Sequence, residues 1–591
     1  MTIEIRTVGV VGCGTMGSGI SEVCARGGFD VVFLEASEEQ VAMGERRIRR
    51  SVERAVERNK LDRAEADAVL GRISSTTAFS GLAGCELVFE AVPEQLDLKK
   101  DVFGRLDEVL SPEAILATNT SSLPVIDMAV ATKRPDRVLG IHFFNPATVM
   151  SLVELVHTVA TDPEVVDSAQ RFAEGLGKTP VACRDRAGFI ANLLLFPYLS
   201  SAVRLFETGF ASREDIDVAM QLGCAHPMGP LALLDLIGLD SGYEICEALW
   251  RQFRDTQDAP PPVLKQYVVA GYLGRKTGRG FYRYERPESP KMTDAVPDSP
   301  GVSISDVGTV GIVGTGLMAS GIAQVTATAG GRVILRGRSR SSLDAAMDAV
   351  ESGLGRTVDK GKLDAAAAAG ALGRVSSTTD LGDLAEADLV LEAVAEDMDL
   401  KREIFRELDA SVKPEAILAT ATSSLPVVEM AAATGRPDRV LGLHFFNPAP
   451  AMKLVEVVRT VATSGEVEKR ALTWVRSLGK RPVRSRDRAG FIVNFLLFPY
   501  LNDAVRMHES GYSTPADIDT AMKLGCGHPM GPFELMDIVG LDVTHAILDS
   551  LHEEFRERRL APAPLLEHMV RAGYLGRKTG RGFYNYGDGG A

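Results

Sequence analysis

The feature that most limits how this chain of 591 residues can fold is an internal repeat. The segment His-Phe-Phe-Asn-Pro at residues 142–146 recurs at 444–448, an offset of 302 residues. The segments 226–230 and 271–282 recur at the same offset, and the register holds without a gap between them. Solenoid repeats run to only about 20–50 residues. The chain is therefore predicted to contain two copies of one enzyme-sized unit.

Within each copy the sequence pattern changes near Asn192 and Asn494. Before these residues, short β-rich runs alternate with helical stretches, which is typical of βαβ units and a mainly parallel sheet. After them, apolar residues recur at helical spacing. The predicted fold class is an α/β Rossmann-type domain followed by an all-helical domain, with the pair repeated twice. The expected parts are 1–187, 188–285, a proline-rich linker at 286–306, 307–489 and 490–591.

The composition of the chain argues against several kinds of binding partner. The net charge of −14 argues against a nucleic-acid partner, because such a protein usually presents a basic face. No apolar run reaches the length of about 18 residues that a membrane span needs, and no signal-peptide pattern opens the chain. The seven cysteines show no CxxC spacing and the nine histidines no ligand cluster. We therefore expect a cytoplasmic protein with free thiols and no metal site.

The first unit opens with a glycine-rich turn between a strand-like run and a helical pattern. Gly12 permits the tight turn, Gly14 lets the backbone approach a pyrophosphate, and Gly17 lets the helix pack on the strand. The start of the helix offers free N–H groups to phosphate. Glu35 stands at the next strand end, where the ribose hydroxyls of NAD are expected. The predicted NAD site comprises Gly12, Gly14, Thr15, Met16, Gly17 and Glu35.

The second unit keeps this turn but changes the charge beside it. Gly337 stands where the first unit has Glu35, and Arg336 and Arg338 flank it. An arginine at this strand end can accommodate the 2′-phosphate of NADP. NADP or NAD is therefore predicted here, with simple loss of cofactor affinity as the alternative. The glycine-rich segment of this site is Gly314, Gly316, Leu317, Met318 and Ala319.

Several motifs follow the glycine-rich turn in a fixed order. They are Asn-Thr-Ser-Ser-Leu at 119–123, the His-Phe-Phe-Asn-Pro segment, Leu-Val-Glu-Leu-Val at 152–156, Gly-Phe-Ile-Ala-Asn at 188–192 and His-Pro-Met-Gly-Pro at 226–230. These motifs resemble those of the L-3-hydroxyacyl-CoA dehydrogenase family, and the resemblance covers both units almost end to end. It implies a catalytic set of His142, Glu154, Ser121 and Asn192 in unit 1, and of His444, Glu456, Ser423 and Asn494 in unit 2.

The chemistry suits these residue types. Oxidation of a secondary alcohol needs a hydride acceptor, which a nicotinamide supplies, and a base for the hydroxyl proton. A histidine titrates near working pH and serves as that base, while a carboxylate orients the ring and stabilises its charged form. The serine and asparagine offer hydrogen-bond donors to substrate oxygens.

The resemblance also implies contacts outside the catalytic set. Near the nicotinamide it places Glu94, Lys99 and Asn119 in unit 1, and Glu396 and Lys401 in unit 2. The alternative for the Glu-x-x-x-x-Lys pairs is a solvated helix face. Ser51, Arg58 and Lys360 match a hairpin that contacts CoA in the family. Asn119 is replaced by Ala421 in unit 2, which weakens a polar contact there.

The predicted activity is reversible NAD(P)-dependent oxidation of (S)-3-hydroxyacyl-CoA to 3-ketoacyl-CoA in two fused units, with an acyl-CoA thioester as the substrate partner. Three alternatives remain open: the same chemistry on an acyl-carrier-protein thioester or on 3-hydroxyadipyl-CoA, a 3-hydroxyacid dehydrogenase centred on a lysine, and a second unit that serves only as a scaffold. The helical domains are expected to pack together as an intrachain pseudo-dimer, and a further homo-oligomer is left open.

Overall fold

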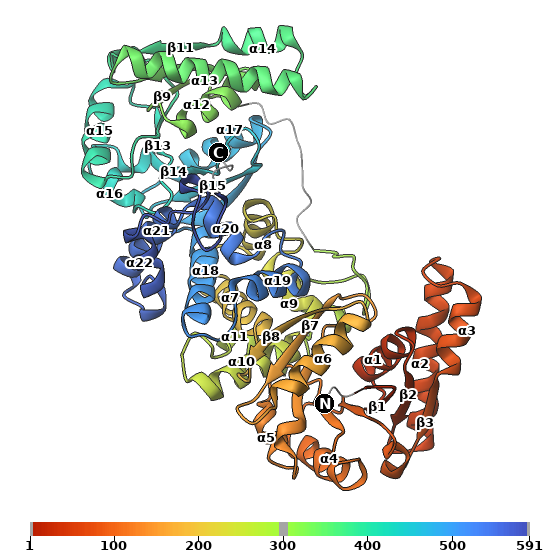
Figure 1. Ribbon diagram of the computed structural model, residues 1–591. Coiled ribbons are helices and arrows are strands. Elements are labelled where there is room, and N and C mark those ends of the chain that lie inside the picture. Colours follow the sequence, from red (N-terminus) through yellow and green to blue (C-terminus); the bar gives the residue numbers. More distant parts are fainter. Residues whose placement is uncertain (1–3, 295–304, 588–591) are drawn as a thin grey trace.

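The computed structural model describes residues 4–294 and 305–587. The two helical domains lie together in the middle of the molecule, and one α/β domain lies at either end (Figure 1). This arrangement confirms the predicted fold class, a Rossmann-type domain followed by a helical domain, repeated twice. Within these residues, no helix is long and apolar enough to cross a membrane.

Each α/β domain is built on an eight-stranded sheet, with strand order β3-β2-β1-β4-β5-β6-β7-β8 in the first. All neighbouring pairs are parallel except β6 and β7, so the last two strands run against the other six. The strands are β1 (Thr7–Val11), β2 (Asp30–Leu34), β3 (Ile73–Thr76), β4 (Leu87–Glu90), β5 (Ile115–Thr118), β6 (Val138–Phe143), β7 (Leu152–His157) and β8 (Thr179–Arg184).

The second sheet repeats this topology in the order β11-β10-β9-β12-β13-β14-β15-β16, with β14 and β15 antiparallel. Its strands are β9 (Thr309–Val313), β10 (Arg332–Arg336), β11 (Val375–Thr378), β12 (Leu389–Glu392), β13 (Ile417–Thr420), β14 (Val440–Phe445), β15 (Leu454–Arg459) and β16 (Arg481–Arg486). In both sheets the central strands are buried along almost their whole length and are mostly apolar, as expected for a parallel sheet covered on both faces.

Helices cover the two sheets in the same order. In unit 1 they are α1 (Thr15–Arg26), α2 (Glu38–Glu57), α3 (Arg63–Gly71), α4 (Leu96–Val109), α5 (Val125–Ala129) and α6 (Pro163–Gly175). In unit 2 they are α12 (Leu317–Thr328), α13 (Arg340–Asp359), α14 (Ala365–Leu372), α15 (Met398–Ser411), α16 (Val427–Ala431) and α17 (Gly465–Ser477). Both long helices α2 and α13 begin at a serine cap, Ser37 and Ser339 respectively.

Within the described residues, each helical domain contains five α-helices. The first contains α7 (Ala191–Glu207), α8 (Arg213–Gly223), α9 (Pro230–Ile237), α10 (Leu239–Phe253) and α11 (Pro262–Val269). The second contains α18 (Val493–Glu509), α19 (Pro515–Cys526), α20 (Pro532–Val539), α21 (Leu541–Phe555) and α22 (Pro564–Arg571). Helices α7 and α18 are in contact, and one continuous hydrophobic cluster runs through both domains.

Two histidines meet where the helical domains join. The imidazole rings of His226 and His528 stack with centroids 4.0 Å apart and planes 10° from parallel. The hydroxyl of Tyr198 lies 3.4 Å from Nδ1 of His226, and that of Tyr500 lies 3.3 Å from Nδ1 of His528. Burial lowers the pKa of His226 to about 4 and that of His528 to about 3. Both rings are therefore uncharged at neutral pH.

The predicted linker differs from expectation at its start. Residues 286–294 do not form a free spacer, because the chain folds back on the first helical domain. Tyr284 pairs with Met292 in a β-bridge, and Thr293 N–H donates to the carbonyl of Arg283 at 2.8 Å. Asp294 forms an ion pair with Arg213 on α8. The expected linker also includes residues 295–304, which lie outside the described residues.

Candidate active sites

The sheet itself forms the histidine–glutamate pair. His142 on β6 and Glu154 on β7 are direct partners across the antiparallel ladder, and side chains opposite one another in such a ladder lie close enough to interact. Nδ1 of His142 lies 2.7 Å from Oε2 of Glu154. Both side chains are buried, with exposed fractions of 4% for the histidine and zero for the glutamate. The strand register thus brings together two residues that lie twelve positions apart in the sequence.

The start of α7 fixes the glutamate from its other side. Oε1 of Glu154 accepts hydrogen bonds from the backbone N–H of Ile190 at 3.0 Å and of Ala191 at 2.9 Å. The free N–H groups at a helix start stabilise negative charge. The carboxylate is therefore held in place while its second oxygen faces the histidine. This contact also ties the helical domain to the sheet.

The second nitrogen of the histidine faces a hydroxyl. Oγ of Ser121 lies 3.0 Å from Nε2 of His142, and Nδ2 of Asn192 donates to the carbonyl oxygen of Ser121 at 3.4 Å. Because Glu154 accepts at Nδ1, the neutral ring carries its proton there and leaves a lone pair on Nε2. The ring can therefore accept a proton from a hydroxyl group placed beside Ser121.

Unit 2 repeats the pair with one difference. His444 and Glu456 are ladder partners, with Nδ1 and Oε2 2.7 Å apart, and Glu456 accepts from the N–H groups of Ile492 and Val493, each at 3.0 Å. Nδ2 of Asn494 donates to the carbonyl of Ser423 at 3.1 Å. Over the described ranges, no hydrogen bond joins the Ser423 hydroxyl to the histidine. The structure thus brings together all four residues in unit 1, and in unit 2 leaves the serine hydroxyl apart.

Aromatic rings enclose each histidine, and the motif analysis did not assign them a part. The ring of Phe144 lies 4.7 Å from that of His142, and Phe189 lies 5.5 Å away. Phe446 and Phe491 repeat these contacts around His444 at 4.5 and 5.6 Å. Phe189 adopts a φ of 50°, a conformation that bulky residues rarely take. This strain at the domain junction aims its ring at the histidine; the only sequence signal for it is its place beside Gly188.

The glycine-rich turn of unit 1 has the shape that a dinucleotide requires. Gly12 has a φ of 90°, and a Cβ there would lie 2.8 Å from the carbonyl oxygen of Ala91. A Cβ on Gly17 would lie 1.8 Å from the carbonyl oxygen of Gly12, so no side chain fits. Thr15 and Met16 begin α1, and space beside Gly14 stays open. The turn opens at the switch between β1 and β4, where doubly wound sheets bind nucleotides.

Glu35 ends the neighbouring strand in unit 1. Its Oε1 accepts a hydrogen bond of 2.6 Å from the backbone N–H of Cys13, inside the glycine-rich turn. Glu38 and Glu39 follow in the first turn of α2. Three carboxylates therefore follow β2 within five residues, and Glu35 is the one that contacts the glycine-rich turn.

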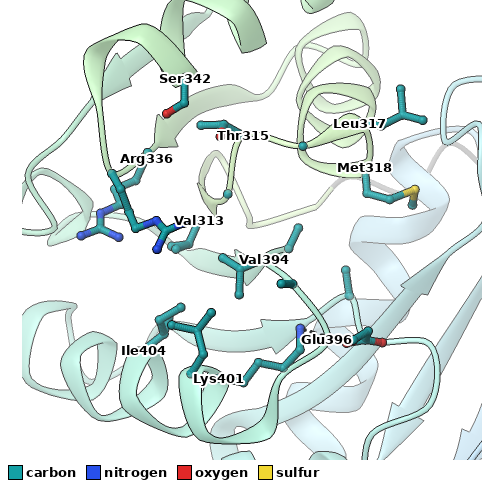
Figure 2. A pocket seen from close by; sticks show the side chains of 18 of the residues that line it. Val313, Thr315, Leu317, Met318, Arg336, Ser342, Val394, Glu396, Lys401 and Ile404 are labelled. Carbon is teal, nitrogen blue, oxygen red and sulfur yellow. Dashed lines mark ion pairs between the residues drawn. The ribbon is translucent and has the colours of Figure 1, made fainter. Parts of the chain in front are cut away.

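The corresponding region of unit 2 is a cavity of about 780 Å³ (Figure 2). Arg336 lies toward one end of it, and Glu396 and Lys401 lie toward the other. The cavity is large enough for a dinucleotide-sized ligand by ordinary pocket dimensions. Its lining includes the predicted residues Gly314, Gly316, Leu317, Met318, Arg336, Arg338, Glu396 and Lys401, together with Gly337, Ser339, Ser342, Ala421 and Ser423. Ala319 is buried behind it.

In both glutamate–lysine pairs the lysine is buried, whereas the side chains of Glu94 and Glu396 are 39% and 42% exposed. Nζ of Lys99 lies 2.7 Å from Oε1 of Glu90 and 3.2 Å from Oε2 of Glu94, and the lysine is 1% exposed. The alternative of a solvated helix face is therefore wrong for this lysine. Burial opposes ionisation of Glu94, but the charge of Lys99 and a hydrogen bond from Thr120 outweigh it and lower its pKa. The sequence repeats this arrangement at Glu392, Glu396 and Lys401.

The remaining predicted residues lie at different depths. Asn119 is buried, and its Oδ1 accepts from the N–H of Phe143 at 2.9 Å, at the end of β6 next to His142. Ser51 and Arg58 lie on α2 and at its end, and Lys360 ends α13. Figure 1 shows both long helices on the outer sides of their domains. No hydrogen bond in the described ranges joins these three residues to either histidine pair.

Within residues 4–294 and 305–587, no group of three or more His, Cys, Asp or Glu is arranged to hold a metal ion. The arrangement defines a class of protein: a nicotinamide-dependent oxidoreductase, with a dinucleotide fold beside a buried histidine–glutamate pair.

Family models place the chain within that class. The model for the NAD-binding domain of 3-hydroxyacyl-CoA dehydrogenase matches residues 7–186 and 309–488, and the model for the C-terminal domain matches 188–284 and 490–586. The chain belongs to the 3-hydroxyacyl-CoA dehydrogenase family, and it carries both family domains twice.

Individual relatives match one unit or both. A 3-hydroxybutyryl-CoA dehydrogenase of Mycobacterium tuberculosis is 49% identical over 286 residues, which is 48% of this chain and 100% of that protein. The mitochondrial hydroxyacyl-coenzyme A dehydrogenase of Rattus norvegicus is 45% identical over 284 residues, 47% of this chain and 90% of that protein. A crystal structure of 3-hydroxybutyryl-CoA dehydrogenase from Escherichia coli covers 97% of this chain and 100% of its own, at 27% identity and a TM-score of 0.70.

Proposed function

We propose that both units catalyse reversible oxidation of (S)-3-hydroxyacyl-CoA to 3-ketoacyl-CoA. The observation that carries the proposal is the buried histidine–glutamate pair, which occurs in both units beside a glycine-rich dinucleotide turn. The relatives named for 3-hydroxybutyryl-CoA support the substrate class. An unused copy would not need to retain His444, Glu456 and Asn494, so the scaffold alternative for unit 2 is disfavoured.

The residues of the chain divide the work of one proton transfer. Nε2 of His142 takes the hydroxyl proton of the substrate, and Glu154 stabilises the imidazolium that forms. Ser121 and Asn192 orient the reacting oxygen and the thioester carbonyl. A nicotinamide bound at the glycine-rich turn supplies the hydride acceptor. The phenyl rings around His142 exclude water from the proton path.

The test is NADH and NADPH oxidation with a panel of 3-ketoacyl-CoA thioesters, the acyl-carrier-protein thioester of the same acyl group, 3-ketoadipyl-CoA and free ketoacids. Turnover of the unsubstituted 3-ketoacyl-CoA thioesters alone supports the proposal, and preference for the acyl-carrier-protein thioester, for 3-ketoadipyl-CoA or for free acids would reject it. His142→Ala and His444→Ala should each leave partial turnover, and the double variant should have none. Complete loss from one single variant would contradict two independent sites.

We propose further that unit 1 uses NAD(H) and unit 2 prefers NADP(H). The strand end that carries Glu35 in unit 1 carries Arg336 and Arg338 in unit 2. The Nε atom of Arg336 is buried and has no hydrogen-bond partner among the described residues. An unpaired buried donor of this kind calls for an acceptor, and a phosphate oxygen supplies one.

The second unit has also lost the space for an acidic side chain. A Cβ on Gly337 would lie 2.7 Å from Cγ2 of Thr315 and 2.8 Å from Cγ of Leu343. The corresponding neighbours in unit 1 are the smaller Cys13 and Val41. The change at position 337 is therefore accompanied by repacking around it, in addition to the two new arginines.

His142→Ala isolates unit 2 for the cofactor test. We expect its kcat/KM with NADPH to equal or exceed that with NADH. Adding Arg336→Leu and Arg338→Ala, the residues of unit 1 at these positions, should lower the NADPH value by at least about tenfold, because two charge-assisted contacts are lost. The same pair of substitutions in the His444→Ala protein is the matched control and should leave unit 1 unchanged. A strong NADH preference of the parent, or no turnover with either cofactor, would reject the assignment.

We also propose that the helical domains form an internal dimer, since α7 and α18 are in contact and bury a shared cluster. A tether raises the effective concentration of the two halves, so pairing within one chain is favoured over pairing between chains. Light scattering coupled to gel filtration should give the mass of one chain, 63.4 kDa. A protein that is dimeric at the lowest measurable concentration, with α7 of one chain paired to α18 of another, would contradict this.

A further inference from the structure

One helix of each helical domain reaches the α/β domain of the opposite unit. Helix α19 of unit 2 contacts β7 and β8 of unit 1, and α8 of unit 1 contacts β15 and β16 of unit 2 (Figure 1). The loop before α19 adds polar contacts, because Ser513 Oγ donates to the carbonyl of Ala182 at 3.1 Å. The guanidinium of Arg186 covers the ring of Tyr512 at 4.9 Å, and that of Arg488 covers Phe210 at 4.6 Å. Each helical domain therefore contacts the α/β domain of the opposite unit.

The end of α19 meets the same face of the sheet as the catalytic pair. Side chains two residues apart along a strand share a face, so Leu152 lies on the side of Glu154, and Phe144 continues the side of His142. A Cβ on Gly525 would lie 2.8 Å from Cδ2 of Leu152 and 3.3 Å from Cε1 of Phe144. The Phe144 ring in turn lies 4.7 Å from the His142 ring. Gly525 is thus separated from the catalytic histidine by one aromatic ring.

The end of α8 repeats this placement at the other site. A Cβ on Gly223 would lie 3.1 Å from Cδ2 of Leu454 and 3.0 Å from Cγ2 of Val493. Leu454 is the counterpart of Leu152, and Val493 directly precedes Asn494 and donates its N–H to Glu456. Gly223 therefore lies against the side chain of a residue whose backbone N–H holds the second catalytic pair.

The glutamate of each catalytic pair also affects the pKa of a cysteine in the opposite unit. The negative charge of Glu154 adds to burial in raising the pKa of Cys526, the residue after Gly525. The charge of Glu456 acts in the same direction on Cys224, the residue after Gly223. Both cysteines are partly exposed.

We propose that Gly525 and Gly223 are specificity-determining residues of the opposite unit, each forming a wall of the acyl pocket in the other half of the chain. The inference rests on the proposed 3-hydroxyacyl-CoA activity. Each glycine packs directly on side chains that border the opposite site, so a side chain added at Gly525 would push Phe144 and Leu152 toward the acyl chain, and one added at Gly223 would do the same to Val493 and Leu454. Each catalytic site is therefore assembled from one α/β domain and both helical domains.

The experiment measures each site alone. In the His444→Ala protein, where only site 1 works, Gly525→Ala should lower kcat/KM for a six-carbon 3-ketoacyl-CoA by about tenfold, because the added methyl group meets a packed neighbour. Four-carbon acetoacetyl-CoA should be affected less. In the His142→Ala protein the same substitution should leave site 2 within about twofold. Gly223→Ala is the matched control and should give the opposite pattern.

A second substitution separates crowding from misfolding. Leu152→Val shortens the side chain that Gly525 faces, so Gly525→Ala combined with Leu152→Val should recover most of the lost kcat/KM at site 1. Equal loss at both sites, loss only at the site of the unit that carries the substitution, or no loss would overturn the wall assignment while leaving the proposed function intact. Absence of turnover by both parent proteins would instead reject the proposed function and the acyl wall with it.

Discussion

The stacked histidines between the helical domains predict a specific acid sensitivity. The unfolded chain binds a proton on each ring below about pH 6.5, whereas the folded protein does so only below about 4 at His226 and about 3 at His528. Because the unfolded state binds more protons within this window, the free energy of unfolding falls as the pH falls through it. Above pH 6.5 the rings contribute no pH dependence.

The size of the effect follows from the two pKa values. At pH 5 the ring is protonated in the unfolded chain, about 1.5 units below its pKa there, and is still neutral in the folded protein. At 1.36 kcal/mol per unit, this difference lowers the free energy of unfolding by about 2 kcal/mol per ring. Two rings together should cost about 4 kcal/mol. This figure depends little on the folded values, provided that both lie well below 5.

The assay compares the native protein with His226→Gln plus His528→Gln in urea unfolding, followed by circular dichroism between about pH 7 and 5. The native protein should lose stability more steeply than the variant, and the difference should approach the figure above. The buried carboxylates Asp217 and Asp519, whose pKa values burial raises to about 7 and 6, act in the opposite sense, but they are present in both proteins. Parallel pH curves for the two proteins would refute the reasoning.

Two further predictions concern the sites. Glu154→Gln in the His444→Ala protein should lower kcat by about 10²–10⁴-fold, because an amide can donate a hydrogen bond to Nδ1 of His142 and so reverse the ring tautomer. Steady-state kinetics with acetoacetyl-CoA test this, and a change within about threefold would contradict it. Lys99→Met should destabilise the first α/β domain by about 3–5 kcal/mol, because Glu90 would remain buried without its partner. Thermal unfolding tests this, with Lys401→Met as the matched change in unit 2. An unaltered unfolding transition of the first α/β domain would contradict the prediction.

Much of the fold could be predicted because the repeat and the strand pattern are local properties of the sequence. Runs such as Thr7–Val11 and Ile115–Thr118 form strands as expected. The reversal of β7 and β8 could not be read in the same way, since both directions suit an apolar strand. The boundary between the first helical domain and the linker could not be predicted either, because a proline-rich sequence does not indicate what residues 286–294 pack against.

The candidate site shows the same division. Motif spacing selected His142 and Glu154, and the ladder register explains why they meet. Spacing alone did not reveal that Lys99 is buried, because its partner Glu90 comes from a neighbouring strand rather than from the same helix. It also gave no sign of Gly525, whose neighbours are more than 300 residues away in sequence. Contacts of this range depend on the tertiary arrangement.

The joining of both units in one chain releases them from a constraint that binds symmetric dimers. In a symmetric dimer each interface residue appears twice, so a change must suit both places at once. Here the rings at the centre have stayed alike, as His226 and His528 show, while the flanking positions have diverged to Phe210 in one half and Tyr512 in the other. A single gene can therefore encode two unlike sites in a fixed one-to-one ratio, which separate subunits with separate expression cannot guarantee.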